Sequence, residues 1–362
     1  MTGLDELQLP NGRLKFPIFL PDGTRGVVRS VSASDMETLG TQALLMNTFH
    51  LMLKPGASTV NSLGGLHQMS GWRGPILTDS GGFQAYSLIR ENPKQGSITN
   101  KGILFRQTET KRKYQLTPEK TIHLQIGFGA DVVICLDDCT HVDDDPATQA
   151  DAVDRTIAWA ARCRAEFDRL VDERGLEAHQ RPKLFAVVQG GGERKLRKRC
   201  AEALLEIGFD GYGYGGWPLD ADYNLLEEML AYLRELIPTE YPLHALGVGH
   251  PESVAVCAKM GYQMFDSALP TRDARRGRLY TFTGPSGLGG TWFRFLYIHD
   301  KQHIRAADPV SEFCDCEACT HYSRGYLHHL FKLQDHLFYR LATIHNLRFM
   351  RLLEDRMRTA YG

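Results

Sequence analysis

The sequence lacks long hydrophobic runs, an excess of either charge and low-complexity tracts. No run of about 18 apolar residues could span a bilayer, and no N-terminal segment combines basic residues with an apolar core, so we expect a cytoplasmic protein with no membrane partner. The 42 lysines and arginines balance 43 acidic residues, so a polyanion would have to bind a local basic patch. The 362 residues suit one large domain, or a domain with an appendage.

Cysteine is sparse, and its spacing does not resemble a secreted disulfide framework. Five of the eight cysteines are scattered, but Cys314, Cys316 and Cys319 form a C-x-C-x₂-C turn. Three thiolates and one imidazole make a closed tetrahedral set that suits a structural Zn²⁺ ion. A chance cluster of thiols is the alternative. Spacing alone leaves the fourth ligand open among the histidines downstream: His321, His328, His329, His336 and His345.

Short apolar runs rich in β-forming residues alternate with longer amphipathic stretches such as 152–173 and 193–209. The eight runs span 17–21, 43–49, 75–80, 131–137, 184–190, 211–216, 243–249 and 263–269. Eight such units predict an α/β protein with a (β/α)₈ TIM barrel, and a doubly wound sheet is the alternative.

The rest of the chain departs from this alternation. A Gly-rich, irregular segment follows residue 282, and a long helical pattern over 323–357 follows the cysteine cluster. We therefore expect a catalytic barrel over 1–282, a zinc-binding subdomain over 283–345, and a C-terminal helix over 323–362 that packs on the barrel.

Polar residues and glycines lie at the carboxyl ends of the predicted strands, where barrels carry their chemistry. In TDSGGFQ, Asp79 and Ser80 should lie at the barrel mouth, Gly81 and Gly82 would let a ligand approach the backbone, and Phe83 would offer a stacking face. An ordinary turn is the alternative.

Two further strands end in Asp137 and in Gln189, which is followed by glycines. A carboxylate, an amide and bare backbone N–H groups around an aromatic face suit guanine, whose N1–H and 2-amino group donate and whose O6 accepts. The alternative for Asp137 is a helix N-cap beside Asp138.

The last predicted strand leads into MFDSALPTRDARRGR (264–278), where Asp266 precedes a cluster of arginines. Arginines in a loop at a barrel mouth can hold phosphates, and a carboxylate there can act as a nucleophile at a sugar carbon. The alternative is a solvated run of charge.

These stretches together resemble the tRNA-guanine transglycosylase family over nearly the whole chain. The matching blocks include MNTFHL (46–51), TDSGGFQ (78–84), VVQGG (187–191), GVG (247–249), MFDSALPTRDARRG (264–277), CDCEAC (314–319) and TIHNLR (343–348). The resemblance implies a barrel with a zinc-binding insertion that exchanges guanine at the wobble position of a tRNA anticodon loop for a 7-deazaguanine. It also implies that His345 is the fourth zinc ligand.

Carried over by position, the resemblance implies that Asp266 is the nucleophile that forms a covalent glycosyl-enzyme intermediate, and that Asp79 is the general acid and base. Two displacements at one carbon retain its configuration. The positions implied for base binding are Ser80, Phe83, Asp137, Gln189, Gly216, Trp217 and Leu246, and those implied for RNA binding are Arg272, Arg275 and Arg276. Family members commonly form homodimers, so we expect one; the leucines of the C-terminal helical pattern suit that interface and packing on the barrel equally.

WPLD (217–220) departs from the family, whose bacterial members typically have Leu-Ala-Val-Gly there. Trp217 changes the bulk and Pro218 removes a backbone donor, so the substituent on the incoming base is left open among aminomethyl, cyano and the larger group of queuine. A paralogue acting on DNA and a noncatalytic partner subunit are alternatives within the family. A retaining glycoside hydrolase and an RNA-binding module are alternatives outside it.

Overall fold

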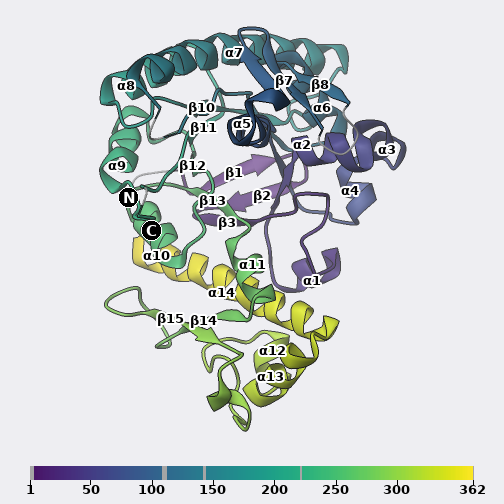
Figure 1. The fold of residues 1–362 in the computed structure, drawn as a ribbon, viewed down its shortest axis with the longest axis vertical. Coiled ribbons are helices and arrows are strands. Elements are labelled where there is room, and N and C mark those ends of the chain that lie inside the picture. The colour runs from purple at the N-terminus through teal and green to yellow at the C-terminus, as the bar shows by residue number, and fades with distance from the viewer. Residues whose placement is uncertain (1–3, 108–111, 142–143, 221, 362) are drawn as a thin grey trace.

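The computed structural model describes residues 4–107, 112–141, 144–220 and 222–361. Its central feature is a parallel sheet of eight strands in the order β3-β13-β12-β11-β10-β9-β5-β4 (Figure 1). The strands are β3 (Ile18–Pro21), β4 (Leu44–Asn47), β5 (Ile76–Asp79), β9 (Val132–Ile134), β10 (Lys183–Val188), β11 (Gly211–Tyr214), β12 (Leu243–Ala245) and β13 (Met264–Ser267). Each falls on one of the eight predicted runs.

The sheet is nearly closed into a barrel. Beyond the end of β3, Asp22 forms a parallel bridge with Leu45 on β4, and the Gly23 N–H donates to the Leu45 carbonyl at 2.7 Å. Because this contact joins the two ends of the strand order, the predicted (β/α)₈ barrel is confirmed and the doubly wound alternative is wrong.

Helices cover the outside of the barrel. They are α1 (Ala33–Thr38), α2 (Thr48–Leu51), α3 (Ala57–Ser62), α4 (Gly65–Ser70), α5 (Gly82–Glu91), α6 (Pro118–Phe128), α7 (Pro146–Glu173), α8 (Arg194–Ile207), α9 (Glu227–Leu236) and α10 (Pro251–Lys259), with the short turns η1 (Met52–Gly56) and η2 (Pro93–Gln95). The stretch predicted to be helical over 152–173 lies within α7, and the one over 193–209 contains α8 and extends one to two residues beyond it. Asp145 caps α7, with its side chain accepting from the Thr148 N–H. The alternative interpretation of Asp137 as the N-cap of this helix is therefore wrong.

Two antiparallel additions to the barrel were not predicted. The hairpin of β1 (Glu6–Leu9) and β2 (Gly12–Lys15) packs Leu9 and Leu14 against the barrel interior. Its turn is held by Asn11, whose backbone N–H donates to the buried carboxylate of Asp131 at 2.8 Å. A three-stranded sheet of β6 (Gly96–Thr99), β7 (Gly102–Arg106) and β8 (Lys113–Leu116) lies between α5 and α6 in the chain.

The C-terminal part contains β14 (Arg278–Phe282), β15 (Phe293–Tyr297), η3 (Lys301–His303), α12 (Glu317–His321), α13 (Arg324–Leu333) and α14 (His336–Tyr361). The prediction of one continuous helix over 323–357 was wrong, because Gln334 adopts a left-handed conformation with φ of 54° and ends α13. The leucines of this helical pattern are therefore divided between α13 and α14. Leu327 and Leu341 are buried, whereas Leu333 is 61% exposed. The expected homodimer stays a prediction.

Helix α14 ties the C-terminal part to the barrel (Figure 1, yellow). The buried carboxylate of Glu354 accepts from the Phe19 N–H of β3 at 3.0 Å and from Arg358 at 3.0 Å. Asn346 accepts from the Tyr280 N–H and donates to the Pro270 carbonyl at 2.9 Å, so it fixes the segment that follows β13. Within the described ranges, no helix combines the length and apolar character needed to cross a membrane.

Candidate active site

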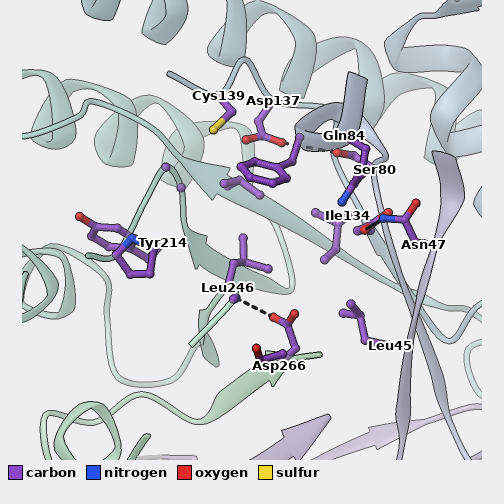
Figure 2. A pocket seen from close by; sticks show the side chains of 18 of the residues that line it. Leu45, Asn47, Ser80, Gln84, Ile134, Asp137, Cys139, Tyr214, Leu246 and Asp266 are labelled. Carbon is purple, nitrogen blue, oxygen red and sulfur yellow. Dashed lines mark hydrogen bonds between the residues drawn. The ribbon is translucent and has the colours of Figure 1, made fainter. Parts of the chain in front are cut away.

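A cavity of about 420 Å³ opens at the carboxyl ends of the barrel strands. Eight of the predicted site residues line it: Asp79, Ser80, Phe83, Asp137, Gly216, Trp217, Leu246 and Asp266. Figure 2 shows Asp137, from the segment after β9, and Asp266, from β13, entering the cavity from different sides, with Leu246 and Asn47 on its walls. The volume is that of a small-molecule site.

Asp79 is the last residue of β5, and its carboxylate accepts three hydrogen bonds. The donors are the Thr48 N–H at 3.0 Å, the Gly81 N–H at 3.1 Å and the Asn47 side chain. Burial raises the pKa of Asp79 to about 7, and the charge of Asp266 contributes to the rise, while the three hydrogen bonds oppose it. Asp79 can therefore take up or release a proton near neutral pH.

Asn47 was assigned no role from the sequence, although it lies in the MNTFHL block. Its side-chain oxygen caps α2 by accepting from the His50 N–H at 2.9 Å. This bond turns the amide N–H₂ group toward Asp79. The signal in the sequence was an Asn at a strand end just before a helix, which is typical of an N-cap.

The two glycines after Ser80 are required by packing within the protein. Gly81 has φ of 76°, and a Cβ there would lie 2.9 Å from the Phe49 nitrogen; a Cβ on Gly82 would lie 2.9 Å from the Leu136 side chain. Gly81 lines the cavity as predicted, but the space beside Gly82 is filled by Leu136, so the expectation that Gly82 admits a ligand was wrong. The ordinary-turn alternative is wrong too, because α5 begins here.

Asp137 and Gln189 form a hydrogen-bonded pair on the other side of the cavity. The Gln189 Nε2 donates to the Asp137 carboxylate at 2.6 Å. Burial raises the pKa of Asp137 to about 6, and the bond from Gln189 lowers it. Gln189 is buried behind the cavity wall, and its Oε1 has no hydrogen-bond partner in the described part of the chain. A buried acceptor without a donor costs about 1–3 kcal/mol, so a ligand donor would be favoured here.

Phe83 and Trp217 lie together at the mouth of the cavity. Their ring centroids are 5.7 Å apart at an interplanar angle of 64°, and 40% and 42% of the two residues are exposed. Large aromatic rings left exposed beside a cavity offer stacking surfaces to a planar ligand. Trp217 is followed along the wall by Pro218 and Leu219, so this rim is apolar.

Asp266 lies in β13 and is held through one of its two oxygens. Oδ1 accepts from the His244 Nε2 at 2.8 Å and from the Gly247 N–H at 3.0 Å. Among the residues that the structure describes, nothing donates to Oδ2. Oδ2 of Asp266, the residue predicted to be the nucleophile, is therefore the oxygen available to a ligand in the cavity.

Arg272, Arg275 and Arg276 lie on a helix, α11 (Leu269–Arg275), and at its end, so the prediction of a loop was wrong; Arg278 begins β14. Pro270 occupies the first turn of this helix, where it needs no N–H donor. Burial lowers the pKa of Arg275, and the charges of Arg29, Arg272 and Arg276 lower it further.

This arginine group (Arg29, Arg272, Arg275 and Arg276) has few negative neighbours. Among the described residues the Arg275 Nη1 is buried without a hydrogen-bond partner, and the negative charge of Asp22 opposes the lowering of the Arg275 pKa. Arg272 and Arg276 are exposed. Arg29 could not be placed beside the other three from the sequence, because it precedes α1.

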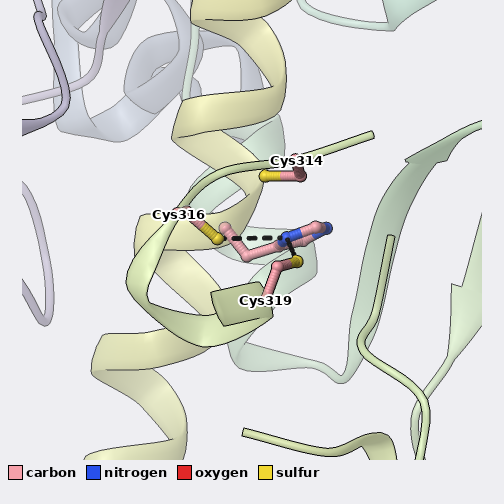
Figure 3. Close-up of side chains that lie close together, drawn as sticks. Cys314, Cys316 and Cys319 are labelled. Atoms are coloured by element: carbon pink, nitrogen blue, oxygen red, sulfur yellow. Dashed lines mark hydrogen bonds between the residues drawn. The ribbon is translucent and has the colours of Figure 1, made fainter. Parts of the chain in front are cut away.

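Cys314, Cys316, Cys319 and His345 lie together as predicted, and their ligand atoms are all within 4.8 Å of one another. The His345 Nδ1 is 3.2 Å from the Cys319 Sγ and 3.5 Å from the Cys316 Sγ (Figure 3). The His345 Nε2 is 2.7 Å from the Tyr280 carbonyl. Since a carbonyl only accepts, Nε2 carries the proton and Nδ1 presents a lone pair to the cluster. These four residues could hold a metal ion.

Barrel enzymes carry their active sites at the carboxyl ends of the strands. The (β/α)₈ barrel with carboxyl groups meeting in one cavity there places this protein in that class. The sequence model described as queuine tRNA-ribosyltransferase matches residues 4–361, so the chain belongs to the queuine tRNA-ribosyltransferase family.

Its curated relatives include queuine tRNA-ribosyltransferases from three bacteria. Those of Halothermothrix orenii and Novosphingobium aromaticivorans are each 37% identical to it; the alignments cover 99% and 98% of this chain and 89% and 90% of the relatives. That of Staphylococcus epidermidis is 35% identical, over 96% of this chain and 86% of the relative.

The coupling between Asp79 and Asp266 can be measured. Because the charge of Asp266 raises the pKa of Asp79, the substitution Asp266→Asn should move that pKa downward from about 7. A ¹³C NMR titration of protein labelled at the aspartate carboxyl carbons, assigned with Asp79→Asn, measures the shift. Asp168→Asn, which removes an acid on α7, is the control and should leave Asp79 unchanged. An unaltered Asp79 titration in Asp266→Asn would contradict the coupling.

Proposed function

We propose that the protein is a tRNA-guanine transglycosylase, which replaces guanine at the anticodon wobble position with a 7-deazaguanine. Family membership supports this function. The observation that carries it is the pair of acids in one base-sized cavity: Asp266 with a free oxygen, and Asp79 with a pKa of about 7.

In the proposed first displacement, Asp266 Oδ2 attacks C1′ of the wobble nucleotide as the bond from C1′ to guanine breaks. Asp79 in its acid form protonates the departing base. In the second, the ionised Asp79 removes a proton from the incoming base, whose nitrogen attacks C1′ and releases the Asp266 carboxylate. Each displacement inverts C1′, so the configuration is retained, and one glycosidic bond replaces another without consumption of a nucleoside triphosphate.

Base recognition would come from the opposite wall. Asp137 would accept from the N1–H and 2-amino groups, and the second Nε2–H of Gln189 and the Gly216 N–H would donate to O6. Phe83 would stack on the base, with Ser80 and Leu246 lining the pocket. The substituent at position 7 would lie against Trp217 and Pro218.

Exchange of labelled guanine tests this function. The protein should incorporate the label into unmodified tRNA, and each candidate base (aminomethyl, cyano and queuine) should then chase it in turn, the fastest naming the substrate. Asp266→Asn should lower exchange by at least roughly 1,000-fold while tRNA binding changes little, because the nucleophile acts only in the chemical step.

Four results would contradict the proposal, each in favour of one alternative. Release of base without incorporation of label would indicate a glycoside hydrolase. Tight binding of RNA without exchange would indicate a binding module, and exchange only after addition of a second chain would indicate a partner subunit. Incorporation into DNA in place of tRNA would indicate the DNA-modifying paralogue.

We propose further that the cluster of Cys314, Cys316, Cys319 and His345 binds one structural Zn²⁺ ion, because three thiols and one imidazole fill all four tetrahedral positions. Elemental analysis should find one zinc per chain, and Cys319→Ser should lose most of it and lower the unfolding temperature. The control is Cys257→Ser, which removes a buried cysteine on α10 and should keep the zinc. Full zinc content in Cys319→Ser would refute this site.

The arginine group would bind phosphates of the anticodon loop, since it concentrates positive charge, includes an unpartnered guanidinium N–H, and interacts with Asp22, which lines the cavity. Arg272→Ala and Arg275→Ala should each weaken tRNA binding about 10-fold and reduce the slope of log affinity against log salt by about 0.7. Lys198→Ala on α8, whose side chain is 57% exposed, is the matched control and should leave both quantities unchanged. Equal effects in all three variants would contradict a local site.

A further inference from the structure

We propose that His244 is a positioning residue that fixes Asp266 for attack on the sugar carbon, an inference that rests on the function proposed above. His244 lies on β12 and is 1% exposed, with its Nε2 2.8 Å from the Asp266 Oδ1. The strands β12 and β13 pair in parallel with His244 opposite Met264. Because side chains alternate along a strand, His244 and Asp266 reach the barrel interior from neighbouring strands.

The surroundings of the imidazole show which of its two nitrogens donates to Asp266. The Nδ1 atom of His244 is buried, and no group in the described part of the chain forms a hydrogen bond with it. A carboxylate oxygen only accepts hydrogen bonds, so the ring nitrogen that faces Asp266 must carry a proton. The His244 Nε2–H therefore donates to the Asp266 carboxylate.

This donor decides which oxygen reacts. The His244 Nε2–H and the Gly247 N–H both donate to Oδ1, so rotation of the carboxylate would break two hydrogen bonds. Oδ2 then forms the bond to C1′ as the bond to guanine breaks. In the resulting ester, Oδ1 becomes the carbonyl oxygen and keeps both donors, and no proton passes through His244.

The alternative is a histidine that merely fills the core. Both roles predict that substitution costs stability, so stability cannot separate them. A positioning role predicts in addition a loss confined to kcat, a loss of covalent intermediate, and recovery when a different side chain restores the N–H donor.

Two variants test this distinction. His244→Leu removes the donor at similar volume and should lower kcat for guanine exchange roughly 100-fold, the effect of one lost donor at a reacting oxygen, with little change in KM for tRNA. The fraction of enzyme trapped as a denaturation-resistant complex with RNA should fall with it. His244→Gln restores an N–H donor and should recover at least about 10-fold of the lost kcat.

Thr78→Val is the matched control, since it removes a buried hydroxyl on β5 that donates to Gln125 at 2.9 Å and does not line the cavity. It should lower the unfolding temperature without a selective loss of kcat. An active parent with kcat unchanged in His244→Leu, or with equal losses in His244→Leu and His244→Gln, overturns the positioning role alone. A parent without exchange overturns the proposed function and this inference together.

Discussion

Burial of carboxyl groups in one cavity is the constraint on which the site depends. Asp79, Asp137 and Asp266 reach the same cavity from separate parts of the barrel, and water is largely removed from the first two. Desolvation disfavours the ionised form of each acid, and the charge of Asp266 adds to the effect at Asp79. The hydrogen bonds from Asn47 and Gln189 oppose it. The balance of these effects leaves the pKa values of Asp79 and Asp137 between about 6 and 7, close to the pH of a cell.

The C-terminal part supports this arrangement through neighbouring residues of one helix. His345 faces the cysteine cluster, while Asn346, the next residue of α14, donates to the Pro270 carbonyl in the first turn of α11 and to the Arg278 carbonyl where β14 begins. The cysteine cluster and the helix that carries Arg272 and Arg275 are thus contacted by consecutive side chains of α14. A displacement of the cysteine turn that moved His345 would also move Asn346, the adjacent residue, and with it the backbone of α11.

The sequence predicted the eight strands and the acids at their ends because strands buried on both faces form short continuous apolar runs. It predicted a loop where α11 lies, in a stretch that contains Pro270, although proline is well suited to the first turn of a helix. It missed the break at Gln334, since few side chains other than glycine, asparagine and aspartate adopt the left-handed conformation. The roles of His244 and Arg29 depend on contacts between segments far apart in the chain, which local patterns do not encode.

The bond between Glu354 and the Phe19 N–H joins residues 335 positions apart. On a ribosome, β3 emerges long before α14 has been synthesised, so this buried N–H of the first barrel strand lacks its acceptor during most of translation. Domains generally fold as units as the chain emerges, and the Phe19 N–H of β3 cannot reach its acceptor until α14 has left the exit tunnel. A nascent chain stalled before residue 354 would expose an unfinished barrel to chaperones and proteases.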